Sequence, residues 1–413
     1  MIYKLGDICD IFDGPHATPA ETSSGPIFLG IKNISEQCEL DFTDVKHLSE
    51  SDYVIWTKRV IPQEDDIVFS YEATLNRYAL IPSGFYGCLG RRLAIARVKD
   101  KSIVNPHYLY HYFCSPKWKA FILANKVIGS TVLRVSVEEF PEYEVDLPDI
   151  AIQNSVAKLL DGITEKRDNN NALCSNLEAM AKLIYDYWFV QFDFPDEHGK
   201  PYKSSGGKMV WNDELKREIP AGWEVKPLGM ICHCLLGGTP SREKAEYWNG
   251  NINWINSGAV NEFRISVPSE TITEAGLANT STYLMPRNTT VLAITGATLG
   301  QVSILNIDSC ANQSVIGVLE NKRVPTEYIY PSVVSSMKLL MRNQTGGAQQ
   351  HINKDDVQSM NLLIPSEHVM DEYMANVKYM YDEIMEKCAE NQQLASLRDF
   401  LLPMLMNGQV KVG

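Results

Sequence analysis

The 413-residue chain has no apolar run that approaches the roughly 18 to 20 residues needed to span a membrane. Its first residues, MIYKLGDICD, lack the basic and then apolar order of an export signal. These two absences exclude a membrane span and predict a cytoplasmic protein with no membrane partner.

Positive charge is also scarce. The chain carries 38 Lys and Arg against 51 Asp and Glu, which gives a net charge of −13, and the acidic excess lies in both halves. Phosphate binding usually leaves a basic footprint, so the charge alone argues against nucleic acid. If the chain binds DNA, its basic residues must be focused on one face, or a partner must supply much of the phosphate contact.

Catalytic motifs are missing as well. Asn105-Pro106-His107-Tyr108 lacks the second Pro of the amino-methyltransferase motif, and no Walker loop, zinc-protease helix or nucleophile elbow is present. Cys232-His233-Cys234 has a metal-like spacing, but no second Cys/His cluster completes four ligands. We therefore expect no catalytic residue, no metal and no cofactor on this chain, and predict that it is not an enzyme by itself.

What the chain does contain is a duplication. The segment PQEDDIVFSYEATL (62–75) aligns with PRNTTVLAITGATL (286–299), and Cys9 and Cys88 align with Cys232 and Cys310. So long a period is not that of a solenoid, whose repeats run to about 20–50 residues. It predicts two similar domains and a connector, and the paired cysteines are expected at equivalent core positions rather than in disulfides.

Each copy reads as short strands broken by Gly and Pro, which predicts mixed α/β (α+β) heads. The expected domains are 1–150 and 223–366 for the two heads, 151–194 and 367–405 for a helix after each head, 195–222 for a linker, and 406–413 for a tail. The expected strands are Ile27–Ile31, Asp66–Phe69 and Leu93–Val98 in the first head, and Trp254–Asn256, Thr290–Ile294 and Ser314–Leu319 in the second.

The segments after the two heads show the alternating spacing of a coiled-coil seam. The two registers superimpose at a constant offset of 221 residues. The expected seam residues are Ile152, Val156, Leu159, Ile163, Leu173, Leu177, Met180 and Ile184 in the first helix, and Tyr373, Val377, Met380, Ile384, Leu394, Leu401 and Leu405 in the second.

Both seams are interrupted by polar residues at the same point: Lys166 and Asn170 in one, Lys387 and Asn391 in the other. Buried polar residues in a coiled coil select register and orientation. If the helices pack antiparallel about a pseudo-twofold axis, these positions meet; the alternative is that they lie on the surface where the helices part. A helix of this length spans about 60 Å, more than the roughly 34 Å of one DNA turn, so the pair would act as a spacer.

Polar, Gly-bearing loops follow the strands, and their side chains suit hydrogen bonds to base edges and phosphates. The alternative is that the Gly residues shape turns and the Thr hydroxyls cap helices. The loops differ between the copies, so the two heads would read different things. The candidate contact residues are Lys32, Asn33, Tyr71, Thr74, Arg77, Arg91, Arg92, Ser130, Thr131 and Arg134 in the first head, and Thr239, Ser241, Arg242, Thr295, Thr298, Gln301, Asn312, Gln313, Gln349, Gln350, His351 and Lys354 in the second.

Seven phrases stand out along the chain: YWFVQFDFP (187–195), GKPYK (199–203), IPAGW (219–223), GTPS (238–241), TGATLG (295–300), TGGAQQHI (345–352) and LRDFLLPMLMNGQV (397–410). Together with the order of head, helix, head and helix, they resemble the DNA-specificity (S) subunit of type I restriction-modification systems, over the whole chain. The first head departs more from this family than the second, with EATLNR and VIGSTVLRVS in place of the usual TGATLG-like and TGG-type loops.

The resemblance implies that each head is a target recognition domain that reads one half of an asymmetric bipartite DNA sequence. It implies that the helices form an antiparallel spacer that docks two modification (methyltransferase) subunits, and that two restriction subunits complete the nuclease. S-adenosylmethionine, ATP and magnesium would then be bound by the partner subunits. Two alternatives stay open: a specificity subunit of a combined type II enzyme, and a coiled-coil scaffold that touches no DNA.

Overall fold

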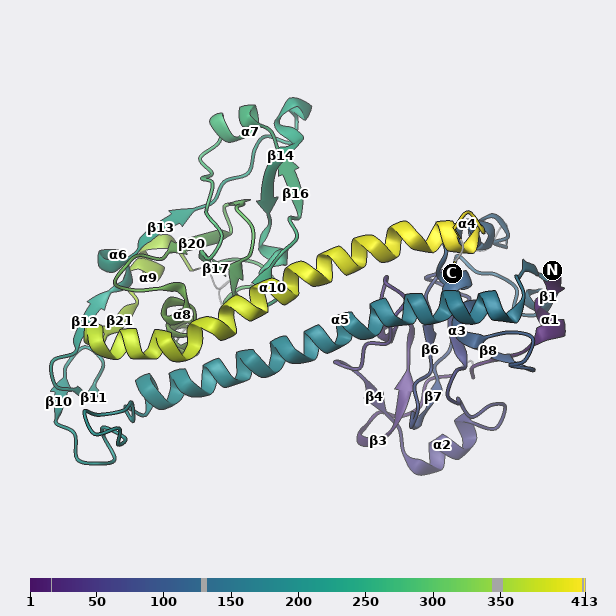
Figure 1. The fold of residues 1–413 in the computed structure, drawn as a ribbon, viewed down its shortest axis with the longest axis horizontal. Helices are drawn as coiled ribbons and strands as arrows, with labels where there is room; N and C mark the ends of the chain where they lie inside the picture. The colour runs from purple at the N-terminus through teal and green to yellow at the C-terminus, as the bar shows by residue number, and fades with distance from the viewer. Residues whose placement is uncertain (16, 128–131, 344–351, 411, 413) are drawn as a thin grey trace. The chain divides into compact units, whose positions relative to one another are not determined.

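The computed structural model describes residues 1–413 apart from 16, 128–131, 344–351, 411 and 413 (Figure 1). The chain divides into two compact units, Met1–Arg167 with Leu394–Gly413, and Asp168–Gln393. Each unit therefore contains one head together with a stretch of both long helices. In the described part of the chain, no helix is long and apolar enough to cross a membrane.

The first head is built on a four-stranded antiparallel sheet of order β2-β8-β5-β6 and a three-stranded sheet of order β4-β3-β7, in which β3 and β7 run parallel. A short pair, β1 and β9, closes the head beside the helix that follows. The elements are β1 (Ile2–Lys4), α1 (Leu5–Ile8), β2 (Cys9–Asp13), β3 (Thr22–Leu29), β4 (Lys46–His47), α2 (Glu50–Trp56), β5 (Ile67–Ser70), β6 (Tyr78–Leu80), β7 (Gly87–Leu89), β8 (Leu93–Val98), α3 (Pro106–Cys114), α4 (Pro116–Ala124) and β9 (Glu144–Asp146).

The second head repeats this plan, with a five-stranded sheet of order β13-β20-β17-β18-β15, a three-stranded sheet of order β16-β14-β19 and the closing pair β12 and β21. The linker that precedes it forms a hairpin of β10 and β11. The elements are β10 (Met209–Asn212), β11 (Arg217–Pro220), β12 (Glu224–Pro227), α6 (Leu228–Ile231), β13 (His233–Leu236), β14 (Trp248–Ile255), β15 (Arg264–Ile265), β16 (Glu270–Ile272), α7 (Glu274–Ala278), β17 (Thr290–Ala293), β18 (Val302–Leu305), β19 (Cys310–Ala311), β20 (Val315–Leu319), α8 (Thr326–Asn343), α9 (Lys354–Gln358) and β21 (Asn361–Ile364).

The paired cysteines confirm the duplication at the level of strand pairing. Cys88 of β7 lies opposite Phe28 in a parallel pair, and Cys310 of β19 lies opposite Trp254 in the matching parallel pair. Both cysteines are fully buried. The six expected strands are present: Leu93–Val98 matches at both ends, and the ends of the others shift by up to six residues. The expectation of mixed α/β heads is confirmed.

The turn after the central strand is also shared. Asn76 and Gly300 occupy matching positions in the two heads and both have positive φ, 64° and 85°. Gly and Asn are the residues that adopt this left-handed conformation most readily. The two heads therefore use different residues to build one turn.

Aromatic side chains dominate the core of the first unit. Phe140 stacks on Phe69 with ring centroids 4.4 Å apart and meets Trp118 edge-on at 6.0 Å. Leu402 and Leu405, near the end of the last helix, pack into the same core. This unit is therefore completed by two segments that are far apart in the sequence.

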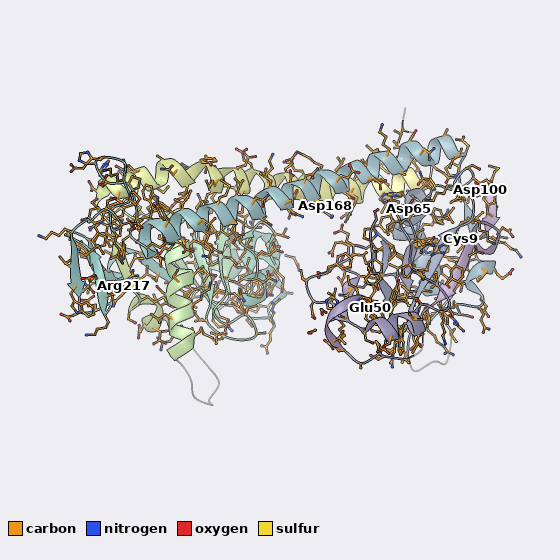
Figure 2. The ribbon with its side chains drawn as sticks, turned by 90° about the horizontal axis from the view of Figure 1, so that it is seen from below. Cys9, Glu50, Asp65, Asp100, Asp168 and Arg217 are labelled. Carbon is orange, nitrogen blue, oxygen red and sulfur yellow. The ribbon has the colours of Figure 1, made fainter. Side chains whose placement is uncertain are left out.

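The second unit draws its linker into its core. Phe189 contacts Trp223 and Tyr373 at centroid distances of 5.8 and 4.8 Å, and Phe194 stacks on Tyr202 at 4.6 Å. Arg217, labelled in Figure 2, lies over the ring of Phe192 at 4.7 Å. The segment between the first helix and the second head is thus a folded part of the second unit.

The two long helices are α5 (Ile150–Tyr185), continued by a π-helical turn at Asp186–Val190, and α10 (Glu367–Met406). In the second unit Asn170 of α5 contacts Asn391 of α10. The seam expected in α10 is confirmed at four positions that are at most 2% exposed: Tyr373, Val377, Met380 and Ile384.

The seam expected in α5 is half wrong. Val156, Ile163 and Leu177 are buried, as expected. Four other expected positions are between 38% and 47% exposed, namely Ile152, Leu159, Leu173 and Met180. The buried positions are each one residue later, at Gln153, Leu160 and Ala181, with Cys174 partly buried.

The error has a simple origin. The observed and the expected seams share every seventh residue. Between two shared residues lies one further seam position, which was expected three residues after the first of them and is observed four residues after it. Leu159 and Leu160 are equally apolar, and Met180 is larger than Ala181, so apolarity alone selected the wrong neighbour.

Candidate nucleic-acid interface

Strand register brings the polar loops of the second head to one edge of its main sheet. Ala293, the last residue of β17, pairs with Val315, the first of β20, and Leu236 at the end of β13 pairs with the neighbouring Ile316. The loops 237–242, 295–301 and 312–314 therefore all leave the sheet at the same end. We call this end the loop edge of the second head.

Direct contacts hold these loops together. Thr239 Oγ1 donates to Gln313 Oε1 at 2.5 Å, and Thr298 Oγ1 donates to the Ser257 carbonyl at 2.8 Å. A Cβ at Gly237 would lie 2.1 Å from the Asn312 carbonyl oxygen, so only glycine permits this approach. Some of these polar and Gly residues therefore shape the loops themselves, which is the role that the alternative interpretation of the sequence gave them.

Arg242 is fixed from two sides. Its two terminal nitrogens donate to Glu270 at 2.5 and 2.9 Å, and its guanidinium lies 3.6 Å from the centroid of the Trp248 ring. The hydrogen bond with Glu270 raises the pKa of Arg242. The group is exposed, but its terminal nitrogens are committed to the carboxylate.

The remaining candidates of the second head lie at or beside the same edge. Thr295 is partly exposed, while Ser241 and Gln301 are exposed. Asn312 Oδ1 accepts from the Ser314 amide at 3.1 Å. Lys354 begins α9, two residues after Ile352, whose amide donates to the Ile294 carbonyl.

The first head has an equivalent loop edge, but it is charged. Ser70 at the end of β5 pairs with Leu93 at the start of β8, so the turn 71–77 and Arg92 emerge together. Arg92 Nε donates to Glu72 Oε1 at 3.0 Å, and Arg77 donates through a terminal nitrogen to Glu36 at 2.8 Å.

Other candidates at this edge differ in accessibility. Thr74, Arg91 and Arg134 are exposed. Tyr71 is only 6% exposed, and its hydroxyl has no hydrogen-bond partner among the residues that the structure describes. Burial raises the pKa of Tyr71. Tyr71, Arg134 and Glu72 line a cleft of about 990 Å³.

Two candidates of the first head have local partners. Asn33 is 2% exposed, and its amide bonds the Asp41 and Asp44 carbonyls and the Gly30 amide, so it shapes its own loop rather than facing outwards. Lys32 pairs with the Asp44 carboxylate at 2.5 Å. Ser130, Thr131, Gln349, Gln350 and His351 lie outside the described residues.

The polar interruption of the helices is partly a direct contact. Asn170 is 3% exposed and donates to Asn391 Oδ1 at 2.9 Å and to Glu390 Oε2 at 3.0 Å, while Asn391 donates to Asn171 at 2.8 Å. The two lysines behave differently. Lys166 is exposed, and Lys387 pairs along its own helix with Glu383 and Glu390.

Sequence reasoning missed the carboxylates that hold the arginines, Glu36, Glu72 and Glu270. It also missed the contacts of α3 with α5 in the first unit, where His107 and His111 lie 2.8 Å from Asp161. The His-x-x-x-His spacing on a helix was the signal available for this cluster. Asn105, read as part of a failed catalytic motif, caps α3 by accepting from two backbone amides.

Comparison with known proteins identifies the family. The family described as "Type I restriction modification DNA specificity domain" matches the chain twice, at residues 1–179 and at residues 220–391. The chain belongs to this family. Each match covers one head and most of the helix that follows it, so the unit that defines the family is the unit that is duplicated in the chain.

Relatives and a solved structure agree with this assignment. The chain is 23% identical over 316 residues to the type I restriction enzyme MjaIX specificity subunit of Methanocaldococcus jannaschii, covering 76% of this chain and 71% of the relative. It is 21% identical over 362 residues to the HindI specificity subunit of Haemophilus influenzae, covering 75% and 79%. The crystal structure of a type I S subunit from M. genitalium shares the fold, with a TM-score of 0.60, 13% identity and coverage of 98% and 95%.

Proposed function

We propose that this chain is the sequence-specific DNA-binding subunit of a type I restriction-modification complex. Each head reads one half of an asymmetric bipartite target, and the helices set the spacer between the halves. The observation that carries the proposal is the pair of loop edges, which leave equivalent sheets at equivalent places and differ in chemistry. One edge bears arginines paired with carboxylates, and the other bears mainly amides and hydroxyls.

The helices also carry a surface suited to partner subunits. Leu173 and Met180 of α5 are 38% and 47% exposed in the second unit, and Ile152 and Leu159 are 39% and 38% exposed in the first. Each pair is seven residues apart and so lies on one face of the helix. Exposed apolar stripes of this kind are typical of surfaces that a partner helix covers.

Two modification subunits would dock on this stripe, and two restriction subunits would join them. The partners would carry S-adenosylmethionine, ATP and magnesium, and they would supply positive charge that this acidic chain lacks. The chain itself would contribute recognition and no catalysis. A combined type II system and a scaffold without DNA are the competing functions.

Footprinting of the full chain with its modification subunits tests the proposal. Two protected patches about one helical turn apart are expected. A single patch would show that only one head reads DNA, and no patch would leave the scaffold function. Neighbouring genes separate type I from combined type II systems, because only the former has separate methyltransferase and nuclease genes.

Lysine substitutions test the docking stripe. Leu173→Lys and Met180→Lys should weaken binding of the modification subunit about tenfold or more, because a charge replaces a buried apolar contact. Ala179→Lys adds the same charge about 100° around the helix from Met180 and should leave binding unchanged in a pull-down titration. Equal losses in all three variants would place the docking surface elsewhere.

A further inference from the structure

The two loop edges place different residues at one equivalent two-residue step. Arg91-Arg92 come directly before β8, and Gln313-Ser314 come directly before β20. Each of these strands pairs antiparallel with the central strand of its sheet at that end, β5 in one head and β17 in the other. Because Leu93 pairs with Ser70 and Val315 with Ala293, Arg92 matches Ser314 in this frame and Arg91 matches Gln313. The heads therefore present arginines and a glutamine from the same two-residue step before the strand, with Arg92 and Gln313 at adjacent positions of that step.

In the first head, Glu72 holds Arg92 by one side only. The Nε–H donates to Glu72 Oε1 at 3.0 Å, and the side chain is 32% exposed. Within the described ranges no other group bonds to the Arg92 guanidinium, so its terminal pair of nitrogens is available. A guanidinium has five N–H donors in a rigid fork. Its terminal pair matches the O6 and N7 acceptors that guanine shows in the major groove.

The backbone of Arg92 also carries strain. Its φ is 74°, a left-handed conformation that is strained for a residue other than glycine. The Tyr71 amide donates to the Arg92 carbonyl at 3.1 Å and ties this conformation to the turn that carries Glu72. Strain that the surroundings maintain in this way is typical of residues whose direction matters.

The other arginines with an ion pair at the described loop edges do not share this arrangement. Arg242 gives both terminal nitrogens to Glu270, and Arg77 gives one to Glu36. Their forks are therefore partly or wholly occupied. Arg92 is the one whose carboxylate partner leaves the fork open.

In the second head, Thr239 orients Gln313. The threonine hydroxyl donates to Gln313 Oε1 at 2.5 Å, which holds the oxygen end of the amide towards Thr239. The carbonyl keeps a second lone pair and the nitrogen keeps its donors, and the side chain is exposed. An acceptor beside a donor is the pattern that pairs with N6 and N7 of adenine.

We propose that the first head reads a guanine through Arg92, positioned by Glu72, and that the second head reads an adenine through Gln313, positioned by Thr239. This assignment rests on the proposed function and adds the class of base that each head recognises. Arg92 and Gln313 touch DNA, whereas Glu72 and Thr239 act through them.

The test is selection from a duplex library randomised over both half-sites, with the full chain bound to its modification subunits. Arg92→Ala should lower discrimination at one guanine roughly tenfold to a hundredfold and leave the other half-site unchanged. Gln313→Ala should do the same at one adenine of the other half-site. Arg92→Lys keeps the charge but loses the fork, so it should lose base preference while still binding DNA.

The positioning residues give a readout that a purely structural role would not. Glu72→Ala should relax the same guanine position as Arg92→Ala, and Glu72→Gln, which keeps an oxygen acceptor, should restore it in part. Thr239→Val should relax the adenine position, and Thr239→Ser should restore it. Equal loss of affinity at every base would show that these side chains only stabilise the loops.

The outcomes separate this assignment from the broader function. A bipartite motif that lacks guanine or adenine at the affected positions would overturn the assignment and leave the proposed function standing. A bipartite motif that none of the variants changes would likewise overturn the assignment and leave the proposed function standing. A wild-type library that yields no bipartite motif would instead overturn the proposed function.

Discussion

The two heads share their sheets but not their attachment to the long helices. Asp161 of α5 and Asp382 of α10 occupy matching positions at the offset of 221 residues. Asp161 turns to the histidines of α3, whereas Asp382 pairs along its own helix with Lys378 at 2.9 Å. Duplication has therefore conserved the frame while the contacts between helix and head have diverged.

The first unit joins helix and head through charge. His107 lies between Asp161 at 2.8 Å and Asp65 at 3.2 Å, and Asp65, labelled in Figure 2, also pairs with Lys101. Burial works against the charged form of Asp161, but hydrogen bonds with His107 and His111 outweigh it and lower its pKa to about 2. The hydrogen bond to Asp161 raises the pKa of His107, against the effect of burial.

The second unit joins helix and head through burial. Glu327 of α8 stands where the first head has His107, and burial raises its pKa. Arg264 is 5% exposed and donates to the Tyr381 carbonyl of α10 at 3.3 Å. The hydroxyl of Tyr373 donates to the Glu327 carbonyl at 3.1 Å. The comparison teaches that one helical frame can be anchored by an ionic cluster or by buried polar groups.

The largest expected effect tests whether the two units are independent. Phe140→Ala should destabilise the first unit by about 3–5 kcal/mol, because it removes a buried ring from the aromatic core. Hydrogen exchange should show lost protection in the first head and unchanged protection in the second. Phe42→Ala, at a 41% exposed ring of the same head, is the matched control and should have little effect. Simultaneous loss in both units would show that they unfold as one.

The next effect tests the ionic attachment. Asp161 has a folded pKa of about 2 against an ordinary value of 3.8, so its stabilisation is present above pH 4 and is lost as the pH falls towards 2. Asp161→Asn should cost about 2 kcal/mol near pH 5, and the difference from wild type should vanish near pH 2 in urea unfolding curves. Asp382→Asn, which breaks an exposed pair, should cost less than about 1 kcal/mol at either pH.

The two units should also differ in how their stability responds to acid. His107, with its raised pKa, stabilises the first unit at low pH, and this contribution is lost as the pH rises through its folded pKa. The raised pKa of Glu327 means that its contribution to the second unit is complete below about pH 4.5 and is lost at higher pH. Acidification from pH 4 to 2 should therefore weaken the first unit through Asp161 without weakening the second through Glu327.

The smallest effect concerns the asparagine pair. Replacing Asn170 and Asn391 together by Leu should change the stability of the helix pair by about 1 kcal/mol, in the stabilising direction, while loosening its register. Mapping of methylated sites should then show more than one spacer length. Asn169→Leu, at an exposed position of the same helix, is the control. A single strict spacer length in the double variant would remove the asparagines from the setting of register.

The frame was predictable because it depends on local signals. Asn76 and Gly300 indicate the same turn, and the apolar runs of the central strands predict the strands of the main sheet. Asn170 and Asn391 were also found, since their seven-residue frame is shared by both possible seams. The choice between Leu159 and Leu160 was not predictable, because it depends on which face each head covers.

The site was predictable only in outline. Loop positions follow from strand ends, so Arg92 and Gln313 could be named as candidates. Their partners, Glu72 and Thr239, could not be assigned, because pairing depends on how separate loops meet at the sheet edge. Asn33 shows the limit in the other direction, since a polar residue in a loop can be used up by the loop itself.

The discontinuous first unit has a consequence for synthesis on the ribosome. Leu402, Leu405 and Met406 belong to the core formed by the first head, yet they are translated after the whole of the second unit. At about 5–20 residues per second, the first head waits some tens of seconds for its last core residues. During that interval the apolar face of the first head is uncovered. The second unit is continuous in sequence, so it can finish folding before the first unit does, although the first head is synthesised earlier.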